Sequence, residues 1–290
     1  MSHLPKKILL ATDGSEDARL AGQAAASLAD NGGAELHVVH AWQSVPHPVV
    51  GADYYEEGAR RLLEEEIEFV FGFGAAVKEA HIVMGPAVDA ILDLGEEIGT
   101  DLLVVGSRGH GTLGRLILGS VSEGVVHYAT RPVLVMRGGE GAWPPGRVVI
   151  GDDGSEAAKK AGELASSIGE LFGARCALVR AYPEFPEADR VGRALDPRAV
   201  DDALRHAERE LHERAEELGS LAGRRPRIGM AAGDAAVAIL EEAREGDNAA
   251  TLIAVGSRDL GLARRLRLGS VSTKVLRVAE SPVLVYPHVE

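Results

Sequence analysis

Two passages of the sequence contain residue types that can bind a phosphate group. GSRGHGTLGRLILGSVS begins at Gly106, and GSRDLGLARRLRLGSVS begins at Gly256. Glycines in such a loop let backbone amides approach a ligand closely. A helix that begins at Gly119–Ser120 would direct its free N–H groups and the positive end of its dipole toward an anion. The hydroxyl groups of Ser120 and Ser122 would add donors, so each passage predicts a site for a small anion such as a phosphate.

The loop that carries these residues is longer than its position requires. Gly106 directly follows an apolar run, and Ser120 is a suitable N-cap for the next helix. About a dozen residues then join the strand to the helix, where two to six are usual. Open α/β sheets bind ligands at the carboxyl ends of their strands, so we interpret the loop as functional. The alternative is that Ser120 only caps its helix and the glycines only form turns.

A carboxylate at the end of the first predicted strand is the second polar part of this site. Asp13 lies in ATDGS, and Asp153 occupies the same place in DDGS. If the strands that end near Asp13 and Gly106 are neighbours, this carboxylate faces the Gly-Ser loop where the strand order reverses. It could then accept hydrogen bonds from a ribose or a base. The alternative is an aspartate that only caps a helix or a turn.

Other patterns in the chain do not indicate a catalytic or metal site. GHGTLG (109–114) matches G-x-G-x-x-G, but that fingerprint belongs on the first strand-to-helix turn. His37 and His40 are three apart on a strand, so they point to opposite faces and make a poor metal site. His110 is the one candidate base beside the loop, and Leu260 replaces it in the second passage. We therefore predict no metal site and no catalytic residue.

The chain repeats itself. Residues 9–18 resemble residues 149–158, and 17 of 30 positions are identical between 106–135 and 256–285. Self-similarity on this scale indicates an internal duplication. The offset between matched segments grows along the chain, so the second copy is longer, mostly between its second and third strands.

Each copy predicts strands that alternate with helices. In the first copy the predicted strands are 6–12, 35–41, 80–84, 101–106 and 132–136, and the predicted helices are 16–30, 55–76, 86–97 and 119–129. This order, with continuous apolar strands, indicates a parallel sheet covered by helices on both faces. The second copy has a charge-rich helix at 197–221, whose charged residues we interpret as a solvated face. With a linker rich in Gly and Pro at 139–146, the sequence predicts two α/β domains, 1–138 and 147–290.

Composition restricts the partners of the protein. The formal net charge is −13 and there is no extended basic tract. Nucleic acids and anionic lipids both need basic surface, so we expect neither as a partner. No apolar run approaches the roughly 20 residues of a membrane-spanning helix, and the N-terminal run is too short for a signal peptide. We therefore expect a cytoplasmic protein that does not bind membranes.

Taken together, three features resemble the universal stress protein family: ATDGS after the first strand, GSRG and GSVS around the long loop, and a closing PVLV strand. The resemblance covers nearly the whole chain, twice. It implies two tandem Rossmann-like domains, each a five-stranded parallel sheet of order 3-2-1-4-5, that pack together through their edges. It also implies that the protein binds ATP, with Mg²⁺, and acts as a nucleotide-dependent stress-response regulator or sensor rather than an enzyme.

The resemblance extends to individual residues. The family's nucleotide signature is Gly, two residues, Gly, nine residues and Gly-Ser, and positions 106, 109, 119 and 120 match it. By resemblance, Asp13 contacts the adenosine, Ala41 lies near the base, and the loop surrounds the phosphates. The residues expected to bind nucleotide are Thr12, Asp13, Gly14, Ala41, Gly106, Ser107, Arg108, Gly109, Gly119, Ser120, Val121 and Ser122 in the first half, and Asp153, Gly256, Arg258, Gly269, Ser270, Val271 and Ser272 in the second.

The second half departs from the signature at one position. Asp259 replaces the glycine found at Gly109, and its carboxylate would repel a phosphate unless Arg264 pairs with it. We therefore predict that the first half is the better nucleotide site. Two alternatives stay open: a slow ATP hydrolase on the same fold, and a nucleotide-free scaffold that binds proteins. Pairing of two chains into a homodimer is also left open.

Overall fold

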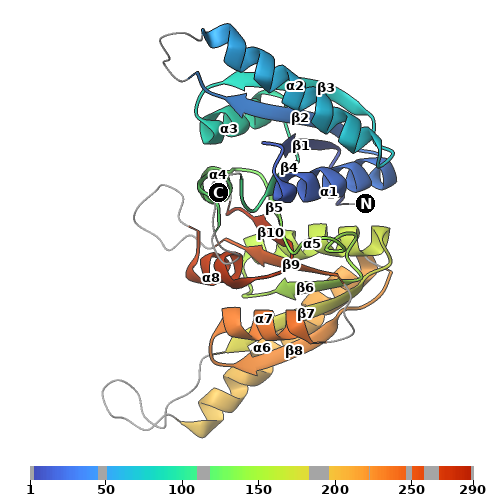
Figure 1. Ribbon diagram of the computed structural model, residues 1–290. Coiled ribbons are helices and arrows are strands. Elements are labelled where there is room, and N and C mark those ends of the chain that lie inside the picture. The colour runs from blue at the N-terminus through green and yellow to red at the C-terminus, as the bar shows by residue number, and fades with distance from the viewer. Residues whose placement is uncertain are drawn as a thin grey trace, which may run out of the picture.

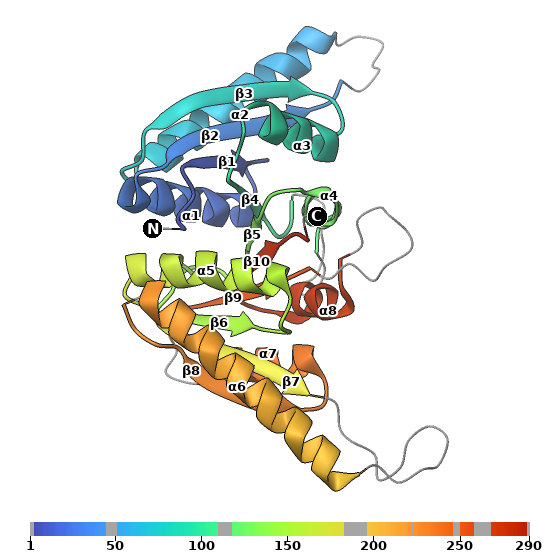
Figure 2. The ribbon, with the colours of Figure 1, turned by 180° about the vertical axis from the view of Figure 1, so that it is seen from behind.

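The computed structural model contains one continuous sheet with the strand order β3-β2-β1-β4-β5-β10-β9-β6-β7-β8 (Figures 1 and 2). The structure describes residues 3–44, 51–109, 118–182, 196–221, 223–245, 250–257 and 268–288. The elements of the first half are β1 (Lys7–Ala11), α1 (Glu16–Gly32), β2 (Glu35–Trp42), α2 (Ala52–Phe71), β3 (Val77–Met84), α3 (Ala87–Glu97), β4 (Leu102–Gly106), α4 (Ser120–Tyr128) and β5 (Val133–Met136). Those of the second half are β6 (Arg147–Gly151), α5 (Glu156–Leu171), β7 (Arg175–Tyr182), α6 (Pro197–Leu221), β8 (Arg227–Ala232), α7 (Ala235–Arg244), β9 (Thr251–Gly256), α8 (Ser270–Val278) and β10 (Val283–Tyr286).

Each half contains five parallel strands in the predicted order 3-2-1-4-5. The prediction of two tandem α/β units is therefore confirmed. The halves do not form two separate sheets, however, because β5 and β10 pair with each other in antiparallel orientation. We call this strand pairing the seam. The second half is longer between its second and third strands, where α6 has 25 residues against 20 in α2.

Helices cover both faces of the sheet, as alternating strand residues require. Ile8 and Leu10 belong to the core cluster under α1 and α2, whereas Leu9 belongs to the opposite cluster under α3 and α4. The second half continues both layers, with α5 and α6 on the first face and α7 and α8 on the second (Figure 1). Among the described residues, no helix has the length and apolar character needed to cross a membrane.

The second helix (α2) and the third strand (β3) of the first half differ from their predicted bounds. The helix predicted to reach residue 76 ends at Phe71, because Gly72 and the left-handed Gly74 (φ 92°) break it. β3 begins at Val77, earlier than the predicted residue 80. The start of this strand was missed because β3 is an edge strand, and the exposed Lys78 and Glu79 do not show apolar alternation.

Contacts at the seam and in the linker join the halves closely. Leu134 pairs with Leu284 at the centre of the seam, and both are fully buried. Just after β5, the buried Arg137 donates through Nη1 to the carbonyl oxygens of Leu276 (2.5 Å) and Ala279 (2.7 Å), at the end of α8. In the linker, Trp143 is buried against the ring of Phe172, the residue that follows α5. The linker therefore packs on the second half rather than acting as a free tether.

Candidate functional site

A cavity of 350 Å³ lies at the carboxyl ends of the central strands of the first half. All the residues predicted from the sequence in this half line it except Gly14 and Ser107. One wall is apolar and includes Val39, Ile91 and Val105, which sequence analysis did not select because nothing distinguishes them from other core residues. The volume lies within the range of about 300–1,000 Å³ that is usual for small-molecule sites.

The turn after β1 fixes the carboxylate of Asp13 at the edge of this cavity. Asp13 Oδ1 accepts a hydrogen bond from the backbone N–H of Ser15 (3.1 Å), and Gly14 between them has a left-handed backbone (φ 77°). The hydroxyl of Ser15 donates to the carbonyl oxygen of Arg108 (3.1 Å), which ties the turn to the Gly-Ser loop. Oδ2 of Asp13 lies so close to Gly109 that a Cβ there would overlap it. The two predicted parts of the site therefore meet directly.

The amino end of α4 forms the opposite side of the cavity, and it differs from the prediction. Gly119, not Ser120, is the N-cap (φ −68°, ψ 151°), and no side chain caps the helix. The first amides of the helix, at Ser120 and Val121, have no intrahelical acceptor. The buried hydroxyl of Ser122 donates to the carbonyl oxygen of Ser107 (2.8 Å), and its role as a donor to the ligand stays a prediction. Ser122 therefore holds the loop in place, and backbone amides face the cavity.

Gly106 has a role in packing, whereas the sequence analysis explained it only by close approach to a ligand. A Cβ at Gly106 would lie 2.6 Å from the backbone N of Ala18 and from the backbone carbon of Asp17. The second half repeats this contact, since a Cβ at Gly256 would lie 2.5 Å from the backbone N of Ala158. In both halves the glycine lets the first turn of a helix touch the end of the fourth strand.

Asp17 is a residue that sequence analysis missed. It accepts hydrogen bonds from Ser107 Oγ (2.5 Å) and from both Nε (2.9 Å) and Nη2 (3.1 Å) of Arg108. The hydrogen bonds from Arg108 to Asp17 raise the pKa of the arginine. The charge of Arg108 is thus balanced by Asp17, so the α4 dipole, rather than this guanidinium, is the positive feature available to a ligand. Nothing in the sequence distinguishes Asp17 from other acidic residues in the first turn of a helix.

Thr12 and the two histidines of β2 occupy separate places. The hydroxyl of Thr12 donates to Glu66 Oε2 on α2 (2.8 Å), away from the ligand side. His40 Nδ1 lies 2.8 Å from the carbonyl oxygen of Thr12, whereas His37 faces the opposite side of the sheet and meets His81. The prediction that His37 and His40 do not share a site is therefore confirmed. Burial, then the neighbouring His81, lowers the pKa of His37, so its ring is neutral at pH 7.

The second half repeats the turn and the helix start. Asp153 Oδ1 accepts from the N–H of Ser155 (2.9 Å), and Gly269 is the N-cap of α8, again without a side-chain cap. Ser270 and Val271 begin that helix, and the buried Ser272 hydroxyl turns back to the Gly269 carbonyl oxygen (3.0 Å). Arg258 and Asp259 lie outside the described residues, as do Arg264 and His110.

The apolar wall keeps its residue types in the second half, as Val179, Ile239 and Val255, but its packing differs at one place. Gly151 stands where the first half has Ala11, which lines the cavity. A Cβ at Gly151 would lie only 2.5 Å from Ile239 Cδ1, so Ile239 fills space that is taken by the Ala11 side chain in the first half. Its counterpart Ile91 lines the open cavity instead. The second half is therefore packed more closely at this place.

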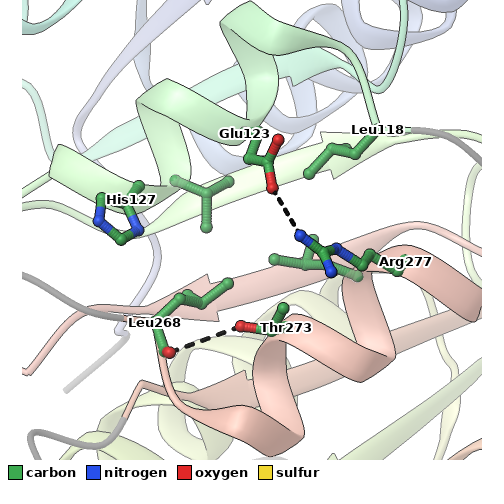
Figure 3. Close-up of a pocket in the computed structure, with 8 residues that line it drawn as sticks. Leu118, Glu123, His127, Leu268, Thr273 and Arg277 are labelled. Carbon is green, nitrogen blue, oxygen red and sulfur yellow. Dashed lines mark hydrogen bonds and ion pairs between the residues drawn. The ribbon is translucent and has the colours of Figure 1, made fainter.

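A smaller cavity of 210 Å³ lies across the seam, between α4 and α8 (Figure 3). Glu123 on α4 faces Arg277 on α8 and forms an ion pair with it (3.1 Å). Leu118 and Leu268, each just before its helix, line the same space. The first turn of α4 is thus in contact with the last turn of α8.

The fold and the cavity define a duplicated α/β protein with a ligand-sized site at the carboxyl ends of its strands. The sequence profile described as the universal stress protein family matches residues 5–137 and again residues 145–287. The chain therefore belongs to the universal stress protein family.

Several known proteins are similar to this chain. A universal stress protein of Mycolicibacterium smegmatis is 29% identical over 86% of this chain and 83% of its own length. A universal stress protein of Thermus aquaticus is 41% identical over 46% of this chain and 98% of its own length. The crystal structure of a universal stress protein from Archaeoglobus fulgidus superposes with a TM-score of 0.71 at 24% identity, covering 97% of this chain and 98% of that one. That structure supports the shared fold.

Proposed function

We propose that the first half binds ATP, together with Mg²⁺, in the 350 Å³ cavity, and that the protein acts as a nucleotide-dependent stress-response regulator or sensor. One observation carries this proposal. A single cavity brings together an apolar wall, the carboxylate of Asp13 and an uncapped helix start at Gly119. These three parts suit a base, a ribose hydroxyl and a phosphate chain respectively.

The two halves are proposed to act as one permanent pair within the chain. The seam buries Leu134 and Leu284 completely, and an isolated half would expose β5 as an unpaired apolar edge. A homodimer is then not needed to protect that edge. The proposed role is binding rather than catalysis. Among the described residues of the cavity wall, no nucleophilic side chain lies beside a second side chain that could act as its general base.

The test removes one backbone amide from the helix start. Ser120→Pro deletes the N–H of the first helical residue, a position where proline is tolerated. The preceding Gly119 already has the extended backbone that proline requires (ψ 151°). A hydrogen bond to a charged group contributes about 1.5–3 kcal/mol, so we expect ATP binding to weaken roughly 10- to 100-fold by calorimetry.

Two variants serve as controls for this test. Ser120→Ala keeps the amide and should bind ATP nearly as well as the native chain. Ser270→Pro makes the same change at the matched helix start of the second half, where Gly269 has ψ 157°. It should leave affinity and stoichiometry unchanged. Equal losses in Ser120→Pro and Ser270→Pro would contradict the assignment to the first half.

A second variant copies the residue of the other half. Gly109→Asp introduces a Cβ that overlaps Asp13 Oδ2 and a second carboxylate beside it. At about 5 Å and an effective dielectric near 20, charge repulsion with a phosphate adds roughly 3 kcal/mol before screening. We expect a loss of about 100-fold or more, and a stoichiometry of one ATP per native chain. Two equivalent ATP sites would refute this, and ATP turnover or a complete lack of binding would favour the hydrolase or the scaffold.

A further inference from the structure

We propose that His37, Glu79 and His81 form a binding site for one divalent transition-metal ion, with Zn²⁺ the best match. Each of these side chains offers one ligand atom, and the three atoms lie within 4.8 Å of one another. The site is near the amino ends of β2 and β3, whereas the cavity lies at the carboxyl ends of the strands. It therefore does not depend on whether the chain binds a nucleotide.

An irregularity in the backbone brings the ligands together. Leu36 pairs with Val77, but the next residue, His37, pairs with Glu79, so Lys78 is an extra residue on β3. Bulges of this kind re-aim side chains and are frequent beside functional sites. Without it, His37 would lie opposite a lysine, whose ammonium group cannot bind a metal ion.

The two imidazole rings are already spaced for a shared ion. His37 Nδ1 lies 3.3 Å from His81 Nε2, the ring planes differ by 17° and the ring centroids are 5.6 Å apart. Two nitrogens bound to one tetrahedral Zn²⁺ at its usual bond lengths are also about 3.3 Å apart. Small rotations of the two rings would aim both lone pairs at one ion at this nitrogen–nitrogen distance.

His37 has a nitrogen that the surrounding protein leaves unpaired. The residue is 5% exposed, and among the described residues its Nε2 has no hydrogen-bond partner. Oε2 of Glu35 lies 3.9 Å from it. If Nδ1 donates its proton to His81, Nε2 is a bare acceptor that faces a carboxylate. If a metal occupies Nδ1, Nε2 carries the proton and can donate to Glu35, which is the carboxylate–histidine–metal arrangement of zinc sites.

The ligand types and the exposure fit a zinc site with an open position. Two imidazoles and one carboxylate are a common set of three protein ligands for Zn²⁺. The side chain of Glu79 is 64% exposed, so an ion can enter from solvent. Two carboxylates, Glu35 and Glu79, outweigh the single cation Lys7, whose ammonium donates to the Ile98 carbonyl oxygen (2.7 Å).

The second half provides an internal comparison. Ala177 pairs with Arg227 and Val179 pairs with Gly229, in the places that His37–Glu79 and Val39–His81 occupy in the first half. None of these second-half residues can bind a metal ion. The proposal therefore predicts one ion per chain rather than two.

The test is calorimetric titration of the untagged, nucleotide-free full chain with Zn²⁺, alongside the visible absorption of bound Co²⁺. We expect one ion per chain. Loss of an outer-shell partner alone costs about 10- to 100-fold in affinity, so His81→Gln should weaken binding by more than about 100-fold and Glu79→Gln by at least about tenfold. His206→Gln, which changes an exposed histidine on α6, should leave binding unchanged.

His81 and Glu79 are the deciding positions because both are less buried than His37, and circular dichroism checks that their variants fold. Glu35→Gln should give a smaller loss than Glu79→Gln. A chain that binds no Zn²⁺ overturns the proposal. Binding that is unchanged in both His81→Gln and Glu79→Gln also overturns it, and neither result bears on ATP binding.

Discussion

Two equivalent regions of the halves contain different polar side chains. One lies between β2, β3 and α3 in the first half, and the other lies between β7, β8 and α7 in the second. In the second half, the buried Glu242 on α7 forms ion pairs with Arg147 and Arg227. In the first half the two histidines and a glutamate meet there, and one histidine nitrogen has no partner among the described residues. At this place the second half pairs its buried carboxylate within the protein, whereas the first half leaves ligand atoms available.

The other face of the sheet carries buried charged groups in both halves, since in the first half the buried Glu66 accepts hydrogen bonds from Thr12 (2.8 Å) and Arg19 (3.2 Å). Arg180 in the second half binds Asp152, donates to Glu210 on α6 (2.9 Å), and lies near Arg214, which is 4.0 Å from Asp152. The interpretation of α6 as a purely solvated charged face is therefore wrong for these residues. Together with Ile239 filling the space beside Gly151, the Glu242 cluster indicates that the duplicated fold has kept its framework in both halves while the packing around α7 differs from that around α3.

The largest effect is expected from Glu242. Glu242→Gln removes the anion between two guanidinium groups, one of which, on Arg147, is only 12% exposed. Breaking a buried ion pair from one side typically costs 3–5 kcal/mol, so we expect a loss of about 3 kcal/mol in the free energy of unfolding. Urea unfolding followed by circular dichroism measures it. His81→Gln at the equivalent place should cost less than about 1 kcal/mol, and equal losses would remove the contrast between the halves.

An intermediate effect is expected where the halves are alike. Gly106→Ala and Gly256→Ala each place a Cβ against the backbone of a helix at 2.5–2.6 Å, and backbone atoms cannot move aside easily. Overpacking of this kind costs about 1–3 kcal/mol, and we expect similar losses for both variants in thermal or urea unfolding. If Gly106→Ala left stability intact and removed only ligand binding, the packing role assigned to this glycine would be incorrect.

The smallest effect is expected at the ion pair across the seam. Arg277 and Glu123 are 61% and 52% exposed, and exposed pairs contribute about 0–1 kcal/mol. Arg277→Ala should therefore lower the free energy of unfolding by less than about 1 kcal/mol, and added salt should reduce the difference. A loss of several kcal/mol would mean that the halves depend on this contact rather than on the seam.

The sequence predicted the parallel α/β architecture, the duplication and the place of the cavity, because continuous apolar strands, paired motifs and a long loop each have a direct structural cause. The strand order came only from the resemblance to the family. It could not place residues whose position depends on packing between elements. Ser120 looked like the cap, but the chain places Gly119 there, against the carbonyl oxygen of Ser107. His81 and Glu79 were not paired with His37, because strand register and the bulge at Lys78 leave no local pattern.

Arg137 makes the contact between the two halves asymmetric. Two identical units that met through this edge would each insert such an arginine, because a two-fold interface repeats every contact. Here the position that corresponds to Arg137 is Pro287, which has no donor side chain. The carbonyls at the end of α8 therefore receive a guanidinium, and within the described parts of the chain the matching end of α4 receives none. Because the two halves are covalently joined, the seam does not have to be symmetric, and a guanidinium links the halves at one end of the seam only.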